Sequence, residues 1–275
     1  MSGMLYIVGT PIGNLGDVTM RQLDTLRTVD FIAAEDTRVT RGLLTHFDIH
    51  KPLVSYHDHS GIRCAEGIVE RLRAGESAAV VTDAGMPCIS DPGEELVRLC
   101  WEAGVQVQVV PGPSAAVSAL AISGLPTGRF AFEGFLPAAK KQRTARLAEL
   151  TGEQRTLIFY EAPHRLTATL EDLYQTFGER RIALCRELTK LYEQVLRMTL
   201  PEAISYYKEK APRGEYVLVL EGAAREDAPA LTFEEVLEQV RRQVDAGMRA
   251  ADACKAAAKA SGFSKNELYR ALLEG

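Results

Sequence analysis

The stretch from Ala78 to Gly93 restricts the possible folds more than any other part of the chain. Its apolar start, Ala78–Val81, is too short for a helix and predicts a buried strand. The following residues are crowded with Gly, Pro, Asp and Ser, which exclude regular structure. Glu94 and Glu95 then place acids in the first turn of a helix. In an open α/β sheet, a strand, loop and helix N-terminus of this kind form the crevice where ligands bind.

Two aspartates mark this loop, Asp83 at the strand end and Asp91 at the start of the helix. They are candidate ligand contacts. They can equally be turn residues whose carboxylates cap their own backbone. The sequence leaves both interpretations open.

The first part of the chain alternates strands with helices. Strands are predicted at 4–8, 29–34, 53–56, 78–81 and 105–110. Helices are predicted after Thr19, at 37–47, after Ser60, after Gly93 and at 114–123. Repeated βα units predict an α/β fold with a mostly parallel sheet and helices on both faces.

A turn at 124–128 predicts a boundary, which gives a first domain at 1–124 and a second at 125–225. In the second domain, strands are predicted at 130–135, 156–160, 181–185 and 215–220, with helices opened by Pro163 and Pro201. Its connections are fewer and longer, so its sheet is expected to be mixed.

A polar stretch at 223–230 predicts a linker to a helical extension at 226–275. Thr232 and Glu235 have capping-box spacing, and further helices are predicted at 250–260 and 265–273. This outline fits a helix-turn-helix, and it also fits a small helical cap.

Composition excludes several classes of protein. The net charge of −5 argues against a protein that binds polyanions over its whole surface, so any nucleic-acid contact must come from a local patch. The five cysteines form no C-x-x-C pair and are odd in number, which indicates reduced thiols and a cytoplasmic protein. We find neither a signal peptide nor an apolar run long enough to cross a bilayer.

Two tempting site patterns are weak. Gly9, Gly13 and Gly16 follow the first strand, but a dinucleotide fingerprint needs one residue between its first two glycines and this chain has three. His57 and His59 flank Asp58, yet alternate residues on an extended segment point to opposite sides. Without a third ligand, we expect no metal site.

Four basic residues, Lys140, Lys141, Arg143 and Arg146, occur with no acid between Gly134 and Ala148. Such a cluster is either a solvated helix face or a set of phosphate contacts. No Ser-His-Asp arrangement or reactive cysteine is indicated.

Four motifs together carry a family resemblance: Leu5–Leu15 (LYIVGTPIGNL), Ala33–Arg38 (AAEDTR), Thr82–Gly93 (TDAGMPCISDPG) and Val110–Ala115 (VPGPSA). They resemble the small-subunit ribosomal RNA methyltransferases of the tetrapyrrole-methylase-like superfamily. Phe135–Pro137, Tyr160–Arg165 and Pro212–Glu215 extend the resemblance over nearly the whole chain. Met86 and Cys88 depart mildly from it, since smaller residues are common there.

The resemblance implies two α/β domains with S-adenosylmethionine in the cleft between them. It implies 2'-O-methylation of a cytidine ribose of 16S ribosomal RNA near the decoding centre, by a homodimer in the bacterial cytoplasm. By resemblance, the donor-binding residues are Asp83, Ala84, Gly85, Ile89, Ser114, Ala115, Leu136 and Tyr160.

The ribose hydroxyl must lose a proton during transfer, so a base near it helps. Candidate bases are Asp36, Glu35 and His57, at strand ends that face one crevice. The basic cluster, with Lys265 of the last helix, would contact RNA phosphates.

Two other functions stay open. One is methylation of a tetrapyrrole carbon or of the diphthamide precursor by the same fold, although neither substrate needs the basic cluster or the helical extension. The other is a non-catalytic RNA-binding module, which predicts no binding of the methyl donor.

Overall fold

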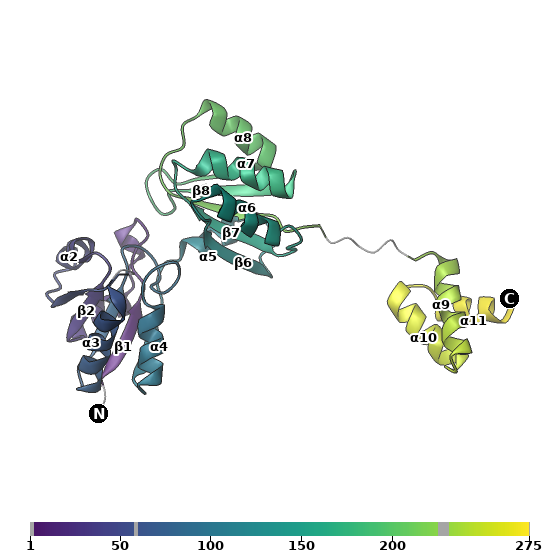
Figure 1. Cartoon of the computed structure of the whole chain (residues 1–275), viewed down its shortest axis with the longest axis horizontal. Coiled ribbons are helices and arrows are strands. Elements are labelled where there is room, and N and C mark those ends of the chain that lie inside the picture. Colours follow the sequence, from purple (N-terminus) through teal and green to yellow (C-terminus); the bar gives the residue numbers. More distant parts are fainter. Residues whose placement is uncertain (1–2, 58–59, 225–230, 275) are drawn as a thin grey trace. The chain divides into compact units, whose positions relative to one another are not determined.

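The computed structural model describes residues 3–57, 60–224 and 231–274 (Figure 1). The chain divides into two compact units, Met1–Ala223 and Ala224–Gly275. Most of the predicted linker, residues 225–230, lies outside the described residues, as do Asp58 and His59.

The first sheet is five-stranded and fully parallel, with the order β3-β2-β4-β1-β5. Its strands are β1 (Met4–Val8), β2 (Phe31–Ala34), β3 (Leu53–Ser55), β4 (Ala78–Val81) and β5 (Gln106–Val110). The associated helices are η1 (Leu15–Asp17), α1 (Met20–Thr28), α2 (Thr37–His46), α3 (Gly61–Arg73) and α4 (Glu94–Glu102). This confirms the predicted parallel α/β architecture.

Apolar cores form on both faces of the first sheet because side chains alternate along each strand. In β4, Ala78 and Val80 belong to a core that includes Leu72 of α3 and Leu96 of α4. Ala79 and Val81, on the opposite face, share a core with α1 and α2. Strands buried on both faces explain the continuous apolar runs in the sequence.

The second sheet has the order β6-β7-β10-β8-β9. Only β6 and β7 pair in parallel, whereas the other neighbours are antiparallel, which confirms the predicted mixed sheet. Its strands are β6 (Phe130–Phe135), β7 (Thr156–Glu161), β8 (Arg181–Arg186), β9 (Gln194–Thr199) and β10 (Tyr216–Leu220). Strand β9 at the sheet edge was not predicted. The helices α6 (Lys140–Glu149), α7 (Leu166–Phe177) and α8 (Leu200–Glu209) share a core with one face of this sheet.

Helix α5 (Ala115–Ser123) differs from expectation. The sequence places it in the first domain, but Ala116, Ala119 and Leu120 are buried with residues of β7, β8 and β10. The chain therefore passes from one core to the other along residues 111–114, before α5 begins.

The second unit contains α9 (Phe233–Asp245), α10 (Ala250–Ser261) and α11 (Lys265–Glu274). Thr232 and Glu235 form the predicted capping box. Gly262, with φ of 80°, ends α10 in the left-handed conformation that favours glycine. A small apolar core around Val236, Val240 and Leu268 joins the helices.

Candidate active site

A cavity of about 480 Å³, within the usual range of small-molecule sites, lies in the first unit. We call it the central cavity. It is lined by Ile12, Glu35, Asp83, Ala84, Gly85, Met86, Ile89, Ser90, Asp91, Ser114, Ala115, Phe135, Tyr160, Glu161, Ala162, Pro163, Cys185, Glu187, Leu188, Lys190, Glu215, Tyr216 and Val217. Both sheets contribute loops to it. The central cavity includes the predicted donor contacts except Leu136, and one of the three candidate bases, Glu35.

The loop after β4 is held in a fixed, unusual conformation. Gly85, with φ of 92°, exchanges two backbone hydrogen bonds with Thr10, over 2.8 and 3.2 Å. Cys88 and Ser90 have φ of 71° and 63°, values that are uncommon outside glycine. Strained backbone of this kind concentrates at functional sites.

The strand-end acids of β2 and β4 are linked. The Asp83 N–H donates to Glu35 Oε2 over 3.3 Å, and the Asp36 N–H donates to Asp83 Oδ1 over 3.1 Å. These bonds hold the ends of neighbouring strands together at the edge of the central cavity.

Asp36 and His57 do not line the central cavity. The Asp36 carboxylate caps α2 and pairs with Arg38, whose hydrogen bonds lower the pKa of Asp36 to about 2. His57 lies in a neighbouring hollow with Tyr56 and Asp91, and its backbone N–H donates to Ser60 Oγ. The three candidate bases are therefore not brought together in one cavity.

Tyr160 forms an aromatic wall. Its ring packs edge-on against Phe132 and Phe135, and its hydroxyl accepts a hydrogen bond from the Ala116 N–H over 3.2 Å. Burial raises the pKa of Tyr160, against the opposing effect of that hydrogen bond. Gly134 lets β6 approach the loop after β4, because a Cβ there would lie 2.9 Å from Ser90 Oγ.

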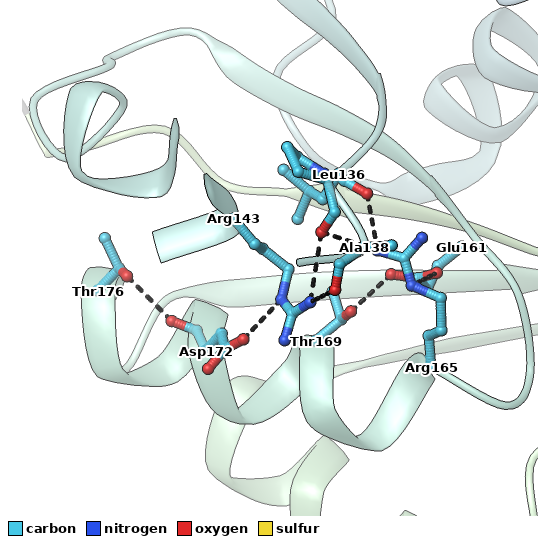
Figure 2. Close-up of polar contacts among 9 residues, drawn as sticks. Leu136, Ala138, Arg143, Glu161, Arg165, Thr169, Asp172 and Thr176 are labelled. Carbon is cyan, nitrogen blue, oxygen red and sulfur yellow. Dashed lines mark hydrogen bonds and ion pairs between the residues drawn. The ribbon is translucent and has the colours of Figure 1, made fainter. Parts of the chain in front are cut away.

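Acids outnumber bases around the central cavity. The acids are Glu35, Asp83, Asp91, Glu161, Glu187 and Glu215, and among the described lining residues Lys190 is the single base. Glu161 is bonded within the protein, because Thr169 Oγ1 donates to it over 2.5 Å and Arg165 lies 3.4 Å away (Figure 2). The net negative charge of the lining favours a ligand that carries positive charge.

Lys190 bridges two of these acids. Its Nζ lies 3.1 Å from Glu187 Oε1 and 3.0 Å from Glu215 Oε2. Burial opposes both charges. The contacts with Glu215 and Glu187 outweigh it for Lys190 and raise its pKa, whereas a hydrogen bond from the Glu215 N–H, together with the Lys190 contact, lowers the pKa of Glu187.

The basic cluster on α6 is divided by burial. Lys140, Lys141 and Arg146 are exposed, although Arg146 pairs with Glu133 and Glu149. Arg143 is only 7% exposed and does not fit the expected role in RNA binding.

The Arg143 guanidinium instead lies between α6 and α7, the helices that pack on the second sheet, and forms hydrogen bonds there (Figure 2). Its Nε donates to Asp172 Oδ2 over 2.6 Å, and its Nη1 donates to the carbonyl of Ala138. The side chain of Leu136 is buried in the apolar core between the second sheet and these helices, and its carbonyl accepts a hydrogen bond from Arg165. Its side chain is therefore not a cavity contact.

Lys265 is exposed at the start of α11 in the second unit. Within the described residues there is no group of three or more side chains suited to holding a metal ion. The described helices include none long and apolar enough to cross a membrane.

Comparisons with known proteins identify the family of the chain. The tetrapyrrole (corrin/porphyrin) methylase family matches residues 4–204, and the RsmI C-terminal HTH domain matches 232–275. The ribosomal RNA small subunit methyltransferase I of Synechocystis sp. is 48% identical, covering 99% of this chain and 98% of that protein. Its Escherichia coli O157:H7 counterpart is 46% identical, covering 99% and 95%. The chain belongs to the ribosomal RNA small subunit methyltransferase I family.

As a member of this family, the chain is a methyltransferase with the tetrapyrrole methylase fold. The solved structure of the methyltransferase CobJ shares this fold, with a TM-score of 0.61 over 81% of this chain and 95% of that one, at 22% identity. The expected α/β fold and family resemblance are confirmed.

Sequence reasoning missed several residues around the central cavity. Three of them, Phe135, Glu161 and Glu215, lie in the family motifs of the second sheet. Membership of these motifs could have marked them as cavity residues. Glu187 and Lys190 come from the loop between β8 and β9, which lacks Gly and Pro and gave no such signal.

Proposed function

We propose that this methyltransferase transfers a methyl group from S-adenosylmethionine to the 2'-hydroxyl of a cytidine ribose in 16S ribosomal RNA, near the decoding centre. The observation that carries the donor assignment is the acidic central cavity between loops of the two sheets. S-adenosylmethionine carries a sulfonium and an ammonium, and an acidic lining attracts both. The relatives named for ribosomal RNA methylation support the choice of substrate.

The donor would be held by Asp83, Ala84, Gly85, Ile89, Ser114, Ala115 and Tyr160, which all line the central cavity. Gly85 permits close approach of its backbone to the ligand. Ile89 and the Tyr160 ring offer apolar surface. S-adenosylmethionine, when bound, supplies an electrophilic methyl group.

We assign the proton acceptor to Glu35. As the ribose oxygen bonds to the methyl carbon, the carbon–sulfur bond breaks, its electron pair stays on sulfur, and the hydroxyl proton passes to the base. Glu35 lines the central cavity, whereas Asp36 has a pKa of about 2 and is a poor base. Alignment of the reacting atoms supplies much of the remaining rate enhancement.

The RNA would contact exposed basic residues with its phosphates, on α6 through Lys140, Lys141 and Arg146 and on α11 through Lys265. We extend the proposal to a homodimer acting in the bacterial cytoplasm, as the family resemblance implies.

Mapping of ribose methylation in 16S RNA from cells with and without this gene tests the function. We expect one cytidine near the decoding centre to lose its methyl group in the deletion strain, and an unchanged map contradicts the proposal. Calorimetry with S-adenosylmethionine separates it from a non-catalytic RNA-binding module, which would bind no donor.

A methyl-transfer assay with the purified enzyme compares small subunits, tetrapyrroles and the diphthamide precursor as alternative methyl acceptors. We expect transfer only to the RNA. Glu35→Gln should lower kcat at least about 100-fold, a much larger effect than its effect on donor affinity, because general base catalysis contributes on that scale. A Glu35→Gln enzyme with normal kcat would exclude Glu35 as the base.

A further inference from the structure

The loop between β8 and β9, residues 187–193, places a lysine in the central cavity. Two of its residues, Glu187 and Thr189, have φ of 50° and 64°. The loop is fastened by hydrogen bonds from the Glu187 N–H to the Glu215 carbonyl and from the Thr189 N–H to the Glu193 carboxylate. This fixed, strained backbone holds Lys190 at the central cavity.

Two glycines make room for the side chains of this loop. A Cβ on Gly13, in the loop after β1, would lie 2.5 Å from Lys190 Cγ, so the lysine stem lies directly against the Gly13 backbone. A Cβ on Gly214 would lie 2.6 Å from the carboxylate of Glu187. Lys190 therefore extends from the second sheet across to the first.

The charge of Lys190 stands out in this setting. It is the single base among the described lining residues, which otherwise include six acids. An ammonium carries three N–H donors, and the contacts with Glu187 and Glu215 account for two. One donor is left for a ligand.

A ribose cannot enter the central cavity without its phosphates, since each nucleotide of an RNA chain is flanked by two phosphodiesters. Their negative charge is repelled by the acids of the lining, including Glu187 and Glu215 beside Lys190. The remaining N–H donor of Lys190, the single base among the described lining residues, is the contact that can offset this repulsion. A lysine ammonium recognises phosphate as a point charge.

We propose that Lys190 is a positioning residue, which binds a backbone phosphodiester next to the ribose to be methylated and so sets the 2'-hydroxyl before the donor. This inference rests on the proposed function and deepens it. Glu187 and Glu215 hold the ammonium in place, and the loop carries it as a fixed contact.

The test compares the full-length wild type with Lys190→Met, Lys190→Arg and Lys208→Ala, using small subunits as substrate. Lys208 is exposed on α8 and serves as the matched loss of one surface charge. We expect Lys190→Met to raise KM for RNA about tenfold or more, with donor affinity unchanged. The slope of log KM against log salt concentration should be smaller for Lys190→Met than for the wild type by about 0.7 to 0.9, the value for one phosphate contact. Lys190→Arg should recover most of the loss, and Lys208→Ala should match the wild type.

A second measurement gives a result on the wild type alone, and Lys190→Met is then compared with it. Small subunits are reconstituted with two 16S RNAs. Each carries a single neutral methylphosphonate, one at the phosphate before the target ribose and the other at the phosphate after it. We expect one of the two positions to raise KM for the wild type about tenfold, and to have no further effect on Lys190→Met.

Distinct outcomes overturn the inference. It is wrong if the wild type methylates the RNA and neither methylphosphonate matters, or if folded Lys190→Met matches the wild type in KM and salt dependence. It is also wrong if Lys190→Met loses donor affinity instead, which would make Lys190 a donor contact. A wild type that methylates no small-subunit RNA overturns the proposed function and this inference with it.

Discussion

The two sheets of the first unit contribute to the same cavity by different means. The first sheet is fully parallel, so the carboxyl ends of its strands share one edge, and their loops bring backbone and carboxylates such as Glu35 and Asp83 together. The second sheet is largely antiparallel and contributes the rings of Phe135 and Tyr160 and the acid–lysine bridge of Lys190.

The sheets also differ in how they use charge. In the first, ion pairs such as Arg38–Asp36 and Arg71–Glu76 lie at the surface. In the second, the Arg143–Asp172 pair is buried between α6 and α7, with both side chains 9% exposed. Buried charges are costly to separate, whereas exposed ones contribute little. Removal of one partner is therefore expected to cost more stability at Arg143–Asp172 than at either surface pair of the first sheet.

The largest expected effect is on the second sheet. Arg143→Ala leaves the Asp172 carboxylate buried without its partner, which should lower the free energy of unfolding by about 3–5 kcal/mol. Urea denaturation measures this. Lys141→Ala on the exposed side of α6 should change stability by less than about 0.5 kcal/mol. Equal effects of the two substitutions would remove the distinction between buried and surface charge.

Close backbone packing in the first sheet is tested at Gly112. A Cβ there would lie 2.8 Å from Gly9 Cα and 2.4 Å from Gln22 Nε2. Gly112→Ala should therefore cost about 1–3 kcal/mol of unfolding free energy and weaken donor binding, because the neighbouring Ser114 and Ala115 shift. Thermal unfolding and calorimetry measure both. Gly128→Ala, which meets no atom within 4 Å, is the control. A stable, fully binding Gly112→Ala enzyme would contradict the packing argument.

A smaller effect is expected where α5 meets the second sheet. Tyr160→Phe keeps the ring but removes the hydroxyl that accepts from the Ala116 N–H. We expect a loss of about 0.5–1.5 kcal/mol in unfolding free energy and less than about a tenfold loss of donor affinity. Tyr174→Phe, on the half-exposed surface of α7, should have no measurable effect. If Tyr160→Phe and Tyr174→Phe do not differ in stability or donor affinity, only the ring of Tyr160 contributes and its hydroxyl does not.

The smallest effect concerns the exposed pair in the first sheet. The pKa of Asp36 is about 2 in the folded protein, below its ordinary value of 3.8, because Arg38 stabilises the carboxylate. Its contribution to stability is therefore present above about pH 4 and is lost as the pH falls toward 2. Asp36→Asn should be slightly less stable than the wild type at pH 6, and the difference should shrink between pH 4 and 3. A difference that stays constant over this range would exclude the ion pair as its cause.

Much of the fold could be predicted because its signals are local. The apolar runs of β1, β2 and β4, the Thr19 cap of α1 and the Thr232 capping box depend on neighbours in sequence. The exceptions depend on distant partners. Strand β9 lies at a sheet edge and none of its residues is buried, so it lacks a continuous apolar run.

The site was less predictable for the same reason. Arg143 looks like its basic neighbours, and only Asp172, on another helix, makes it a buried ion-pair partner. The spacing of Arg143 and Leu147, both buried on one face of α6, is consistent with this in retrospect. His57 likewise lies in the neighbouring hollow, which shares Asp91 with the central cavity, and its position relative to this distant residue is not visible in the local sequence.

A short connection before α5 links the two walls of the central cavity. Val110 is buried in the core of the first sheet, and Ala115, at the start of α5, packs against that of the second, so residues 111–114 connect the two. Pro111 and Pro113 have fixed φ angles, and Gly112 is wedged against Gly9. This short and stiff connection restricts the distance between the two walls of the central cavity. A ligand that contacts both sheets must therefore fit between walls that the chain itself ties together over a few residues.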